Sequence, residues 1–416
     1  TSAELWVDLV ETVECSMIAG LSDAARSILE YSPYDGHMQV EPHSTYAALR
    51  TGCPVFHNEE LDFWALFRFG DVQAASRDWE TFTSTSGAFL ESELEAMREF
   101  MPPEGKFQDM DPPRCLQLRK LVRDPFAAAA VARMEPMIRA IVTELIDGFA
   151  QEGSADLAVE FAEPLPVRVI SDMLGIPRQD QGDVSGWCHG MFEREAGAAT
   201  EHAYACGYKI RDYFHAMADG RRRQPRDDLM SHIANADIDG VPLTQEEILG
   251  MVMLLYAAGN ETTSMLIGNA LNLLDQLPQE RRRLAADPSA IPGAIEEMLR
   301  YEAPVSWQAR MTTRDIDVDR VTIPKGKKVL LMYGSANRDE SVFANADEYT
   351  PDRPLTRHLS FGEGIHFCLG APLGRLEARI ALEEILRRIP NYRITGAIQW
   401  SRTSVLRGPI SLPAEF

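Results

Sequence analysis

A glycine-rich stretch near the end of the sequence, Phe361–Gly370, constrains the fold more than any other part of the chain. It reads Phe-Gly-Glu-Gly-Ile-His-Phe-Cys-Leu-Gly, and a helical pattern follows it from Ala371 to Arg388. Glycines this close together predict tight turns, or a backbone that lies against something flat. Cys368 then lies among backbone N–H groups, near the positive end of a helix dipole. Both features favour the thiolate, which is the form of cysteine that binds metal.

This stretch has two other interpretations besides a loop that carries a metal ligand. A lone cysteine is more often a small buried apolar residue, and a dinucleotide-binding fingerprint fails because Phe367 stands where its third glycine should be. The full pattern, Phe-Gly-x-Gly-x-His-x-Cys-x-Gly, is long and specific, and it resembles the haem-binding loop of the cytochromes P-450. The resemblance implies that Cys368 is the axial thiolate of a haem (heme b, iron protoporphyrin IX). The other loop residues that it assigns to the cofactor are Phe361, Gly362, His366 and Gly370.

A second stretch is unusual because polar residues interrupt a helix that is otherwise apolar all round. Thr244–Glu247 is a capping box, and we expect the helix that it opens to run to about Leu277. Ile248–Ala258 is apolar on every face, which predicts burial, but Gly259–Thr263 follows it. A glycine costs about 1 kcal/mol against alanine inside a helix, and buried polar groups without partners cost more. The break indicates either a functional site or a polar crossing between packed helices.

The break, Ala258-Gly259-Asn260-Glu261-Thr262-Thr263, is similar to the oxygen-activation motif of the same family. Ala258 and Thr262 are four residues apart and share one helix face. The hydroxyl of Thr262 can donate and accept hydrogen bonds, and Glu261 can relay protons from solvent. The resemblance implies that Glu261 and Thr262 are catalytic and deliver protons to dioxygen, with Ala258 beside the haem.

The family pattern also implies cofactor contacts and structural residues elsewhere. It assigns Arg119, Arg310 and His366 to the haem propionates. Cys115 stands where the family usually has His, and a thiol is a poor donor, so one propionate contact is in question. A buried ion network, which is tolerable only when every charge is partnered, is assigned to Glu297, Arg300 and Arg353.

The resemblance implies a mainly α fold with small β-sheets, the cytochrome P-450 fold, in which the haem lies between the long central helix and the helix after the cysteine loop. Without a repeat or a linker, we expect residues 1–416 to form a single domain, with β structure around 50–70, 315–335 and 390–416. The expected helices are 1–30, Tyr46–Arg50, Asp71–Arg77, Trp79–Phe82, one after Pro113, most of 131–277, one ending at Arg300, and Ala371–Arg388. Breaks in 131–277 are expected at Gly153, Pro164–Pro166, Pro177 and Pro225–Asp239. The expected strands are Val55–Asn58, Phe63–Phe69, Ile316–Asp319, Val321–Ile323 and Lys328–Tyr333, and Gly87–Lys106 is expected to be a surface loop.

Charge and cysteine content argue against several classes of protein. With 41 basic and 63 acidic residues the net charge is −22, which argues against nucleic acid or anionic membranes as partners. No apolar run reaches the ~18 residues of a membrane span, and Thr1–Gly20 resembles neither a signal peptide nor a membrane anchor. The six cysteines show no disulfide spacing, which predicts a reducing cytoplasm. The pairs Cys188-His189 and His202-x-x-x-Cys206 imitate part of a zinc site, but no other zinc signature lies near them.

As a function, the resemblance implies a soluble, bacterial-type haem-thiolate monooxygenase that uses dioxygen to oxidise an apolar small molecule. Apolar side chains assigned to the pocket favour a terpenoid, steroid or lipid-like substrate, although each could instead be plain core. These residues are Met251, Leu254, Leu255, Ala258, Val305, Trp307 and Val405. Electrons would come from an iron–sulfur ferredoxin with an NAD(P)H-dependent reductase. We expect the ferredoxin to dock on basic residues near the cysteine loop; alternatively, those residues only form a solvated basic face. They are Arg114, Lys120, Arg123, Arg375 and Arg379.

Two further functions remain open at this point. A peroxide-driven haem-thiolate peroxygenase tends to lose the acid–alcohol pair, and Glu261-Thr262 argues against it. A non-enzymatic haem-thiolate gas sensor would need neither a substrate-sized cavity nor a proton relay.

Overall fold

The computed structural model of the chain describes residues 31–90, 100–191, 194–195, 198–354 and 357–416. The expected helix over residues 1–30 and the middle of the expected loop Gly87–Lys106 lie outside these residues. No helix of the described part is long and apolar enough to cross a membrane.

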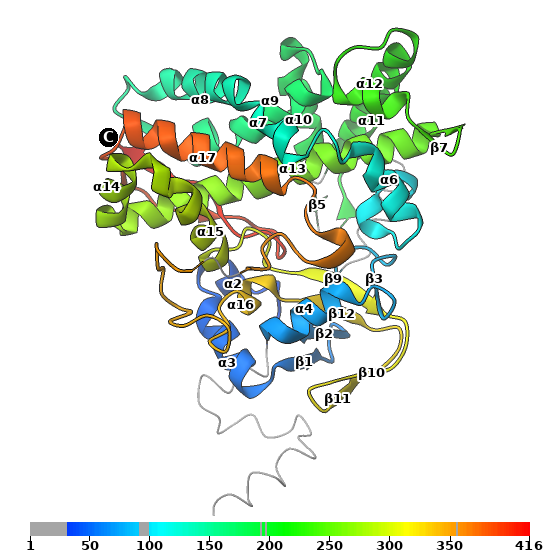
Figure 1. Cartoon of the computed structure of the whole chain (residues 1–416), viewed down its shortest axis with the longest axis vertical. Helices are drawn as coiled ribbons and strands as arrows, with labels where there is room; N and C mark the ends of the chain where they lie inside the picture. The colour runs from blue at the N-terminus through cyan, green and yellow to red at the C-terminus, as the bar shows by residue number, and fades with distance from the viewer. Residues whose placement is uncertain (1–30, 91–99, 192–193, 196–197, 355–356) are drawn as a thin grey trace, which may run out of the picture.

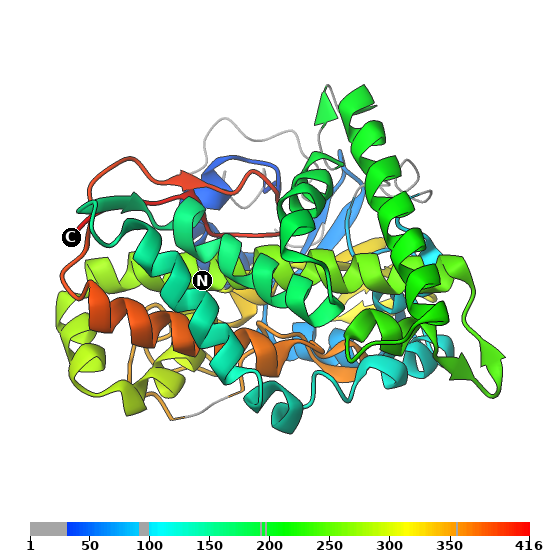
Figure 2. The ribbon, with the colours of Figure 1, turned by 90° about the horizontal axis from the view of Figure 1, so that it is seen from above.

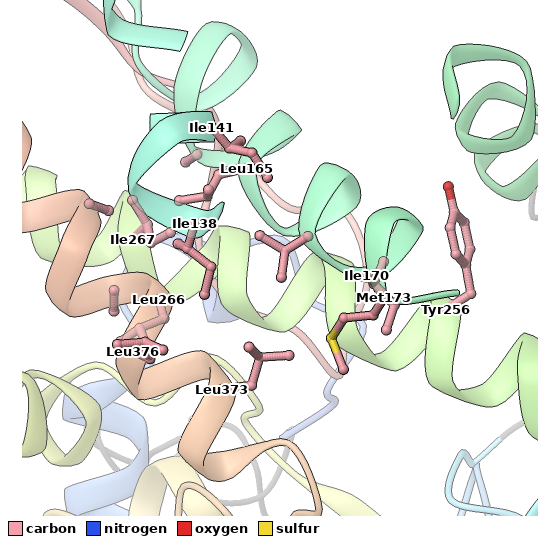
Figure 3. Close-up of a cluster of buried hydrophobic side chains, with 14 of the residues drawn as sticks. Ile138, Ile141, Leu165, Ile170, Met173, Tyr256, Leu266, Ile267, Leu373 and Leu376 are labelled. Atoms are coloured by element: carbon pink, nitrogen blue, oxygen red, sulfur yellow. The ribbon is translucent and has the colours of Figure 1, made fainter. Parts of the chain in front are cut away.

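Four helices build the main core: α8 (Glu135–Phe149), α9 (Pro164–Leu174), α13 (Gln245–Gln276) and α17 (Ala371–Arg388). In Figures 1 and 2, α13 crosses the helical part of the molecule, with α17 alongside it and α8 and α9 packed over both. Figure 3 shows apolar side chains of all four helices meeting, among them Ile138, Leu165, Ile267 and Leu376. Burial of each such side chain contributes about 1.5–3 kcal/mol, so this cluster fixes α13 against α17.

The start of α13 confirms the predicted capping box. Thr244 Oγ1 accepts a hydrogen bond from the Glu247 N–H at 3.1 Å, and Glu247 Oε2 accepts one from the Thr244 N–H at 2.8 Å. The helix ends at Gln276, one residue before the predicted end, and is buried along most of its length. The polar break of the sequence therefore lies inside a continuous buried helix.

A five-stranded sheet forms the other part of the molecule, at the lower end in Figure 1. Its order is β1 (Val55–Asn58), β2 (Phe63–Leu66), β12 (Lys328–Leu331), β9 (Gln308–Thr312) and β3 (Phe82–Thr83). The pair β2–β12 is parallel, and the other three pairs are antiparallel. The predicted hairpin of β1 and β2 is confirmed, and β9 was missed by the sequence analysis.

The remaining elements are short and surround these two parts. The other helices are α2 (His37–Val40), α3 (His43–Gly52), α4 (Phe69–Arg77), α6 (Arg114–Val122), α7 (Ala128–Ala132), α10 (Arg178–Gly190), α11 (Glu201–Arg223), α12 (Leu229–Ala234), α14 (Pro278–Ala286), α15 (Ile291–Tyr301) and α16 (Tyr333–Ala336). Single turns of 3-10 helix occur at η2 (Pro103–Gly105), η3 (Phe107–Asp109), η5 (Pro288–Ala290) and η6 (Gly364–His366), and η4 (Ala158–Ala162) is a π turn. The small sheets pair β10 (Ile316–Val318) with β11 (Val321–Ile323), β4 (Ser154–Asp156) and β13 (Arg393–Ile394) with β16 (Pro413–Glu415), β14 (Gln399–Trp400) with β15 (Pro409–Ser411), β5 (Arg194–Glu195) with β6 (Ala198–Ala199), and β7 (Asp237–Ile238) with β8 (Val241–Pro242).

Several local predictions were wrong for identifiable reasons. Trp79–Phe82 is a turn that leads into β3 rather than a helix, because Phe82 pairs with Thr312 of β9. The predicted break Pro225–Asp239 contains α12, whose first turn is capped by the side chain of Asp228. Pro164–Pro166 does not interrupt a helix but begins α9, since proline is tolerated in a first turn.

Candidate functional site

One cavity brings together both sequence motifs, which are about a hundred residues apart along the chain. Ala258, Gly259 and Thr262 of α13 line one side, and residues of Phe361–Gly370 line the other. Segments from η3, α6 and β9 complete the wall. The predicted space between α13 and the helix of the cysteine loop is therefore present.

The cysteine loop turns sharply because two of its glycines adopt positive φ angles. Gly362 has φ +67° and Gly364 has φ +71°, a region that favours glycine. A Cβ on Gly364 would also lie 2.7 Å from the Ser76 carbonyl oxygen at the end of α4. After these turns the Cys368 N–H donates to the Phe361 carbonyl at 2.8 Å, which closes the loop and places Cys368 at the cavity.

The thiol of Cys368 experiences opposing influences. Burial raises its pKa, whereas the N–H groups of Gly370 and Ala371 and the charge of Arg119 act in the opposite direction. The expected N–H donors are thus present, but burial outweighs them in the protein alone. A bound metal ion changes this balance because a coordinating thiol is deprotonated.

Three nitrogen donors line the same cavity without an acidic partner. Arg119 donates to the Phe367 carbonyl, and Arg310 donates to the Ala309 carbonyl at 2.7 Å. Neither forms an ion pair with a carboxylate of the described residues, although Arg310 is 4% exposed and a buried cation without a counter-charge is unfavourable. His366 Nε2 is buried and has no hydrogen-bond partner in the described part of the chain.

This donor set fits the haem that the sequence predicts. Burial, with the nearby charges of Arg310 and Arg119, lowers the pKa of His366 to about 3, so the ring is neutral and can donate from one nitrogen. Two arginines and this imidazole suit two propionate carboxylates, and Cys368 supplies a thiolate ligand on the same cavity. Cys115 is buried but does not line the cavity, so its thiol does not take the role of the histidine that the family pattern has at this position.

The catalytic pair predicted on α13 is divided between the cavity and the opposite side of the helix. Thr262 lines the cavity, and its hydroxyl donates to the Ala258 carbonyl at 2.9 Å. Glu261 does not line it and is oriented toward Glu163 and His189. Burial, reinforced by the charge of Glu163 and opposed by His189, raises the pKa of the Glu261 carboxyl. His189 Nδ1 and Glu163 Oε1 are 3.8 Å apart at the surface. Because both charges act on Glu261, its carboxyl lies near this exposed pair, off the cavity wall.

The residues predicted to contact substrate separate into two groups. Leu254, Leu255 and Val305 line the cavity. The structure places Met251, Trp307 and Val405 in the apolar core, at 0%, 1% and 8% exposure, and not on the cavity wall. Successive side chains of an extended chain point to opposite faces. Gln308 and Arg310 face the cavity, so Trp307 faces away from it.

The predicted ion network forms away from the cavity. Arg300 donates to both oxygens of Glu297 at 2.8 Å, and Arg353 Nε lies 3.1 Å from each of them. Although burial opposes it, hydrogen bonds from Arg300 and from the Thr350 N–H lower the pKa of Glu297. These contacts fasten α15 to the irregular segment that precedes the cysteine loop, which fits a structural role.

The sequence analysis did not assign several polar residues of the cavity wall, among them Gln108, Gln308 and Glu377. Glu377 of α17 is 2% exposed, its Oε2 has no partner in the described residues, and burial raises its pKa to about 8. Its position four residues after Leu373, on the same helix face, was the signal that could have identified it.

The pairs Cys188-His189 and His202-x-x-x-Cys206 do not extend into a metal site. Cys206 Sγ lies 3.4 Å from His202 Nε2. Within the described ranges, no group of three or more His, Cys, Asp or Glu side chains could hold a metal ion.

Comparison with known proteins agrees with this geometry. A family model described as Cytochrome P450 matches residues 199–390. The chain is 37% identical to Cytochrome P450 130 of Mycobacterium tuberculosis, over 89% of this chain and 94% of the relative. Its structure is similar to that of PksS, a cytochrome P450 of the Bacillus subtilis bacillaene polyketide synthase, with a TM-score of 0.85, 32% identity, and coverage of 92% and 99% of the two chains. It is also similar to CYP109E1 from Bacillus megaterium in complex with testosterone, with a TM-score of 0.82, 29% identity, and coverage of 92% and 99%.

The first prediction concerns the ligand of the haem. Reduced protein under carbon monoxide should show the strongly red-shifted Soret band of thiolate-ligated haem. Cys368→Ala should lose this band, because Cys368 is the thiol that the loop places on the cavity. Cys53→Ala makes the same change at a half-buried cysteine away from the cavity and should keep the band. An unchanged band in Cys368→Ala would contradict the assignment.

The second prediction concerns the buried carboxyl of Glu377. Its pKa is 4.5 in an ordinary environment and about 8 in the folded protein, because burial disfavours the charge. Between these pH values the unfolded chain releases a proton that the folded protein keeps, so the free energy of unfolding should fall as pH rises, by roughly 1.4 kcal/mol per pH unit. Glu377→Gln cannot titrate and should gain stability relative to the unmodified protein over that range.

Urea unfolding of both proteins at several pH values measures this difference. Glu152→Gln serves as the same substitution at an exposed position. A stability difference between Glu377→Gln and the unmodified protein that stays constant from pH 4.5 to about 8 would show that Glu377 is not held neutral.

Proposed function

The chain belongs to the cytochrome P450 family, and from this premise we propose that it oxidises a terpenoid, steroid or lipid-like molecule with electrons from a ferredoxin. It is a haem-dependent cytochrome P450 monooxygenase of the bacterial type, which binds dioxygen and a substrate and receives electrons from redox partners. The observation that carries the proposal is the cavity that joins Cys368 and Thr262 to an apolar wall. A cytoplasmic location remains a prediction from the spacing of the cysteines.

The substrate proposal rests on the apolar side chains of the cavity wall. Leu254, Leu255, Ile170, Phe107 and Val305 line the cavity, and all of them are apolar. Such walls bind a hydrophobic molecule by removing its surface from water. The similar protein CYP109E1 is described in complex with testosterone, which supports a steroid-sized apolar ligand.

In the proposed mechanism, the haem supplies dioxygen activation and oxygen transfer when it is bound. Cys368 would ligate it, while Arg119, Arg310 and His366 would bind its propionates. The Thr262 hydroxyl donates to Ala258, which leaves its lone pairs able to accept a hydrogen bond from a water in the cavity. Burial raises the pKa of the Glu261 carboxyl, which favours its protonated form and suits a proton donor inside the protein. The exposed pair of His189 and Glu163 connects Glu261 with solvent, and Glu261 is proposed to be recharged from that side.

The two alternatives lack a supporting observation. A peroxide-driven enzyme would not need a proton relay, but Thr262 lies at the cavity and Glu261 lies behind it on the same helix. A gas sensor would not need an apolar wall of the kind that Leu254, Leu255 and Val305 form.

The electron-donor proposal changes in one respect once ion pairing is considered. Arg114 pairs with Glu247, Arg375 with Glu296 at 2.6 Å, and Arg379 with Glu383 at 3.0 Å. These partners neutralise three of the five cations named from the sequence. Lys120 of α6 and Arg123, the C-cap residue of that helix, remain exposed, and Arg123 pairs with the exposed Asp124 at 3.5 Å.

Two further arginines extend this basic patch around the cysteine loop. Arg77 and Arg357 are 54% and 58% exposed and share a single carboxylate, that of Glu363 in the loop, so the three side chains together keep one positive charge. Phe367 links them to α6, because its carbonyl accepts from Arg119 and its ring lies 6.0 Å from the Arg357 guanidinium. We define the proximal basic surface as Arg77, Lys120, Arg123 and Arg357, and propose that an acidic ferredoxin docks there.

The third prediction tests the proton-delivery role of Thr262. Thr262→Ala should still bind haem and consume reductant, but product formed per reductant consumed should fall roughly tenfold, with hydrogen peroxide released instead. Thr262→Ser keeps the hydroxyl and should be much milder. Thr143→Ala is the matched control, since Thr143 of α8 makes the same hydrogen bond, to the Arg139 carbonyl at 2.8 Å, away from the cavity. Unchanged coupling in Thr262→Ala would remove Thr262 from the mechanism.

The fourth prediction tests the docking surface. Charge reversal at Lys120 and Arg123 together should slow reduction by an acidic ferredoxin roughly tenfold at low salt, and less at high salt, because electrostatic attraction speeds association and is screened by ions. The measurement is the stopped-flow rate of reduction against salt concentration. The same reversal at Arg393 and Arg402, which are exposed near the C-terminus, changes the net charge equally. Equal slowing in both double variants would point to net charge and reject the site.

A further inference from the structure

Two fully buried hydroxyl groups outside the cavity have no hydrogen-bond partner among the described residues. They are the phenol of Tyr256 on α13 and the Oγ of Ser171 on α9, and both residues are 0% exposed. Tyr256 does not line the cavity, and Figure 3 shows its hydroxyl pointing away from Leu373 of the cavity wall. A buried hydroxyl that lacks a hydrogen bond costs about 1–3 kcal/mol. Internal water is the usual partner of such groups in native proteins.

The two hydroxyls lie near each other where α9 packs against α13. A Cβ on Gly259 of α13 would lie 3.8 Å from Ile170, the residue before Ser171, so the two helices approach closely here. Burial raises the pKa of the Tyr256 phenol, whereas the hydroxyls of Ser171 and of Ser185 on α10 lower it. Both serines therefore lie beside the phenol, although Tyr256 and Ser171 form no direct hydrogen bond. A water molecule between these groups can bond to each of them.

A third buried polar atom lies one turn further along the same face of α13. Asn260 follows Tyr256 by four residues, so the two side chains are neighbours on the helix surface. Asn260 is 5% exposed, and its Oδ1 also lacks a hydrogen-bond partner within the described ranges. The unsatisfied oxygens thus continue from Tyr256 toward Glu261, the residue after Asn260.

Cys188 of α10 joins these groups to Glu261. It follows Ser185 by three residues on the same helix face and is 5% exposed. Burial raises the pKa of Cys188 to about 12, and the charge of Glu261 acts in the same direction. Cys188 in turn raises the pKa of Tyr256, so its thiol is near both side chains. We define the polar wedge, which α9, α10 and α13 enclose, as Ser171, Ser185, Cys188, Tyr256 and Asn260.

Packing alone does not account for the Tyr256 hydroxyl. The ring packs edge-on against Phe214 of α11, with 6.0 Å between the ring centroids, and this contact needs no hydroxyl. Tyr392, which is also 0% exposed, donates to the Leu271 carbonyl of α13 at 2.7 Å. A buried tyrosine against this helix can therefore be satisfied by the protein itself, and Tyr256 is not.

We propose that the polar wedge binds internal water and that this water passes protons to Glu261. The inference rests on the proposed proton-delivery role of Glu261 and deepens it, because Glu261 gains a connection to solvent besides His189 and Glu163. Ser185 is half-buried and forms the outer end of this connection. Each water or hydroxyl receives one proton and releases one, so Tyr256 is left unchanged while the Glu261 carboxylate regains the proton it gave up. Tyr256 is a positioning residue, since it holds the water.

A crystal structure of the haem-loaded enzyme tests whether water binds in the wedge. We expect ordered water within hydrogen-bond distance of both Tyr256 Oη and Ser171 Oγ. Tyr256→Phe keeps the ring and its contact with Phe214 but loses the hydroxyl, so the water bound to that hydroxyl should be lost. A wedge without ordered water in the unmodified enzyme would overturn the proposal.

Hydrogen–deuterium exchange of the Glu261 carboxyl tests the connection. Infrared spectra are recorded after the haem-loaded enzyme is mixed with D2O, and Glu261→Gln identifies the carboxyl band. All proteins carry His189→Ala, which breaks the surface pair and also favours the protonated carboxyl, because His189 lowers its pKa. We expect Tyr256→Phe to slow exchange about tenfold, as when one hydrogen-bonded step is lost. Tyr392→Phe, the same change at a buried tyrosine with a backbone partner, should leave the rate unchanged.

Each outcome decides one part of the inference. If water is present but Tyr256→Phe exchanges at the unmodified rate, the water is structural and the connection to Glu261 is overturned. Equal slowing in Tyr392→Phe would also overturn it. Ser171→Ala removes the other buried hydroxyl and should slow exchange as well, so the test does not depend on one variant. Neither measurement uses a substrate or a redox partner. Slowed exchange in an enzyme that forms no oxidised product would reject the proposed function and keep the connection.

Discussion

The whole site depends on one hydrogen bond, from the Cys368 N–H to the Phe361 carbonyl, which closes the cysteine loop at 2.8 Å. The loop can close only because Gly362 and Gly364 adopt φ angles that other residues rarely take. Around this turn, α4 supports Gly364 from outside and α17 begins immediately after it. The ion network of Glu297 then holds the preceding segment to α15. A loop without regular structure is thereby as fixed as a core element.

Electrostatics in the cavity follow from the same arrangement. Arg119 and Arg310 are positive and lack a carboxylate partner in the described residues, and the thiol of Cys368 is buried with its pKa raised. The two cations without a counter-charge are unfavourable in the protein alone, whereas burial keeps Cys368 as the neutral thiol and not as the thiolate that binds metal. One group with two carboxylates and a metal ion resolves all of them together, because it supplies both the missing anions and a partner for the thiolate. Part of the free energy of cofactor binding would therefore come from giving these groups the partners that they lack in the protein alone.

Patterns within one segment were predictable from the sequence, whereas contacts across the fold were not. The capping box at Thr244, the β1–β2 hairpin and the long helix α13 follow from local rules, and the structure confirms them. Trp307 was assigned to the pocket by position, but strand alternation in the unrecognised β9 turns Gln308 inward instead. The pairing of Arg114 and Arg375 needs acidic partners from other helices, so it could not be seen in the sequence, whereas Arg379 and Glu383 form an i,i+4 pair that the sequence analysis missed.

The polar residues that interrupt α13 serve either helix packing or the function of the cavity, and the structure distinguishes the two. If helix packing required Gly259, a Cβ there would clash with a neighbour, but the nearest atom would be Ile170 at an ordinary 3.8 Å. Alanine would fit that space and would favour the helix by about 1 kcal/mol. Gly259 instead lines the cavity between Ala258 and Thr262, and Asn260 Oδ1 remains buried with no hydrogen-bond partner among the described residues. A polar crossing built for packing would pair such groups. Ala258, Gly259 and Thr262 are therefore explained by the cavity that they line, whereas Asn260 and Glu261 lie off its wall.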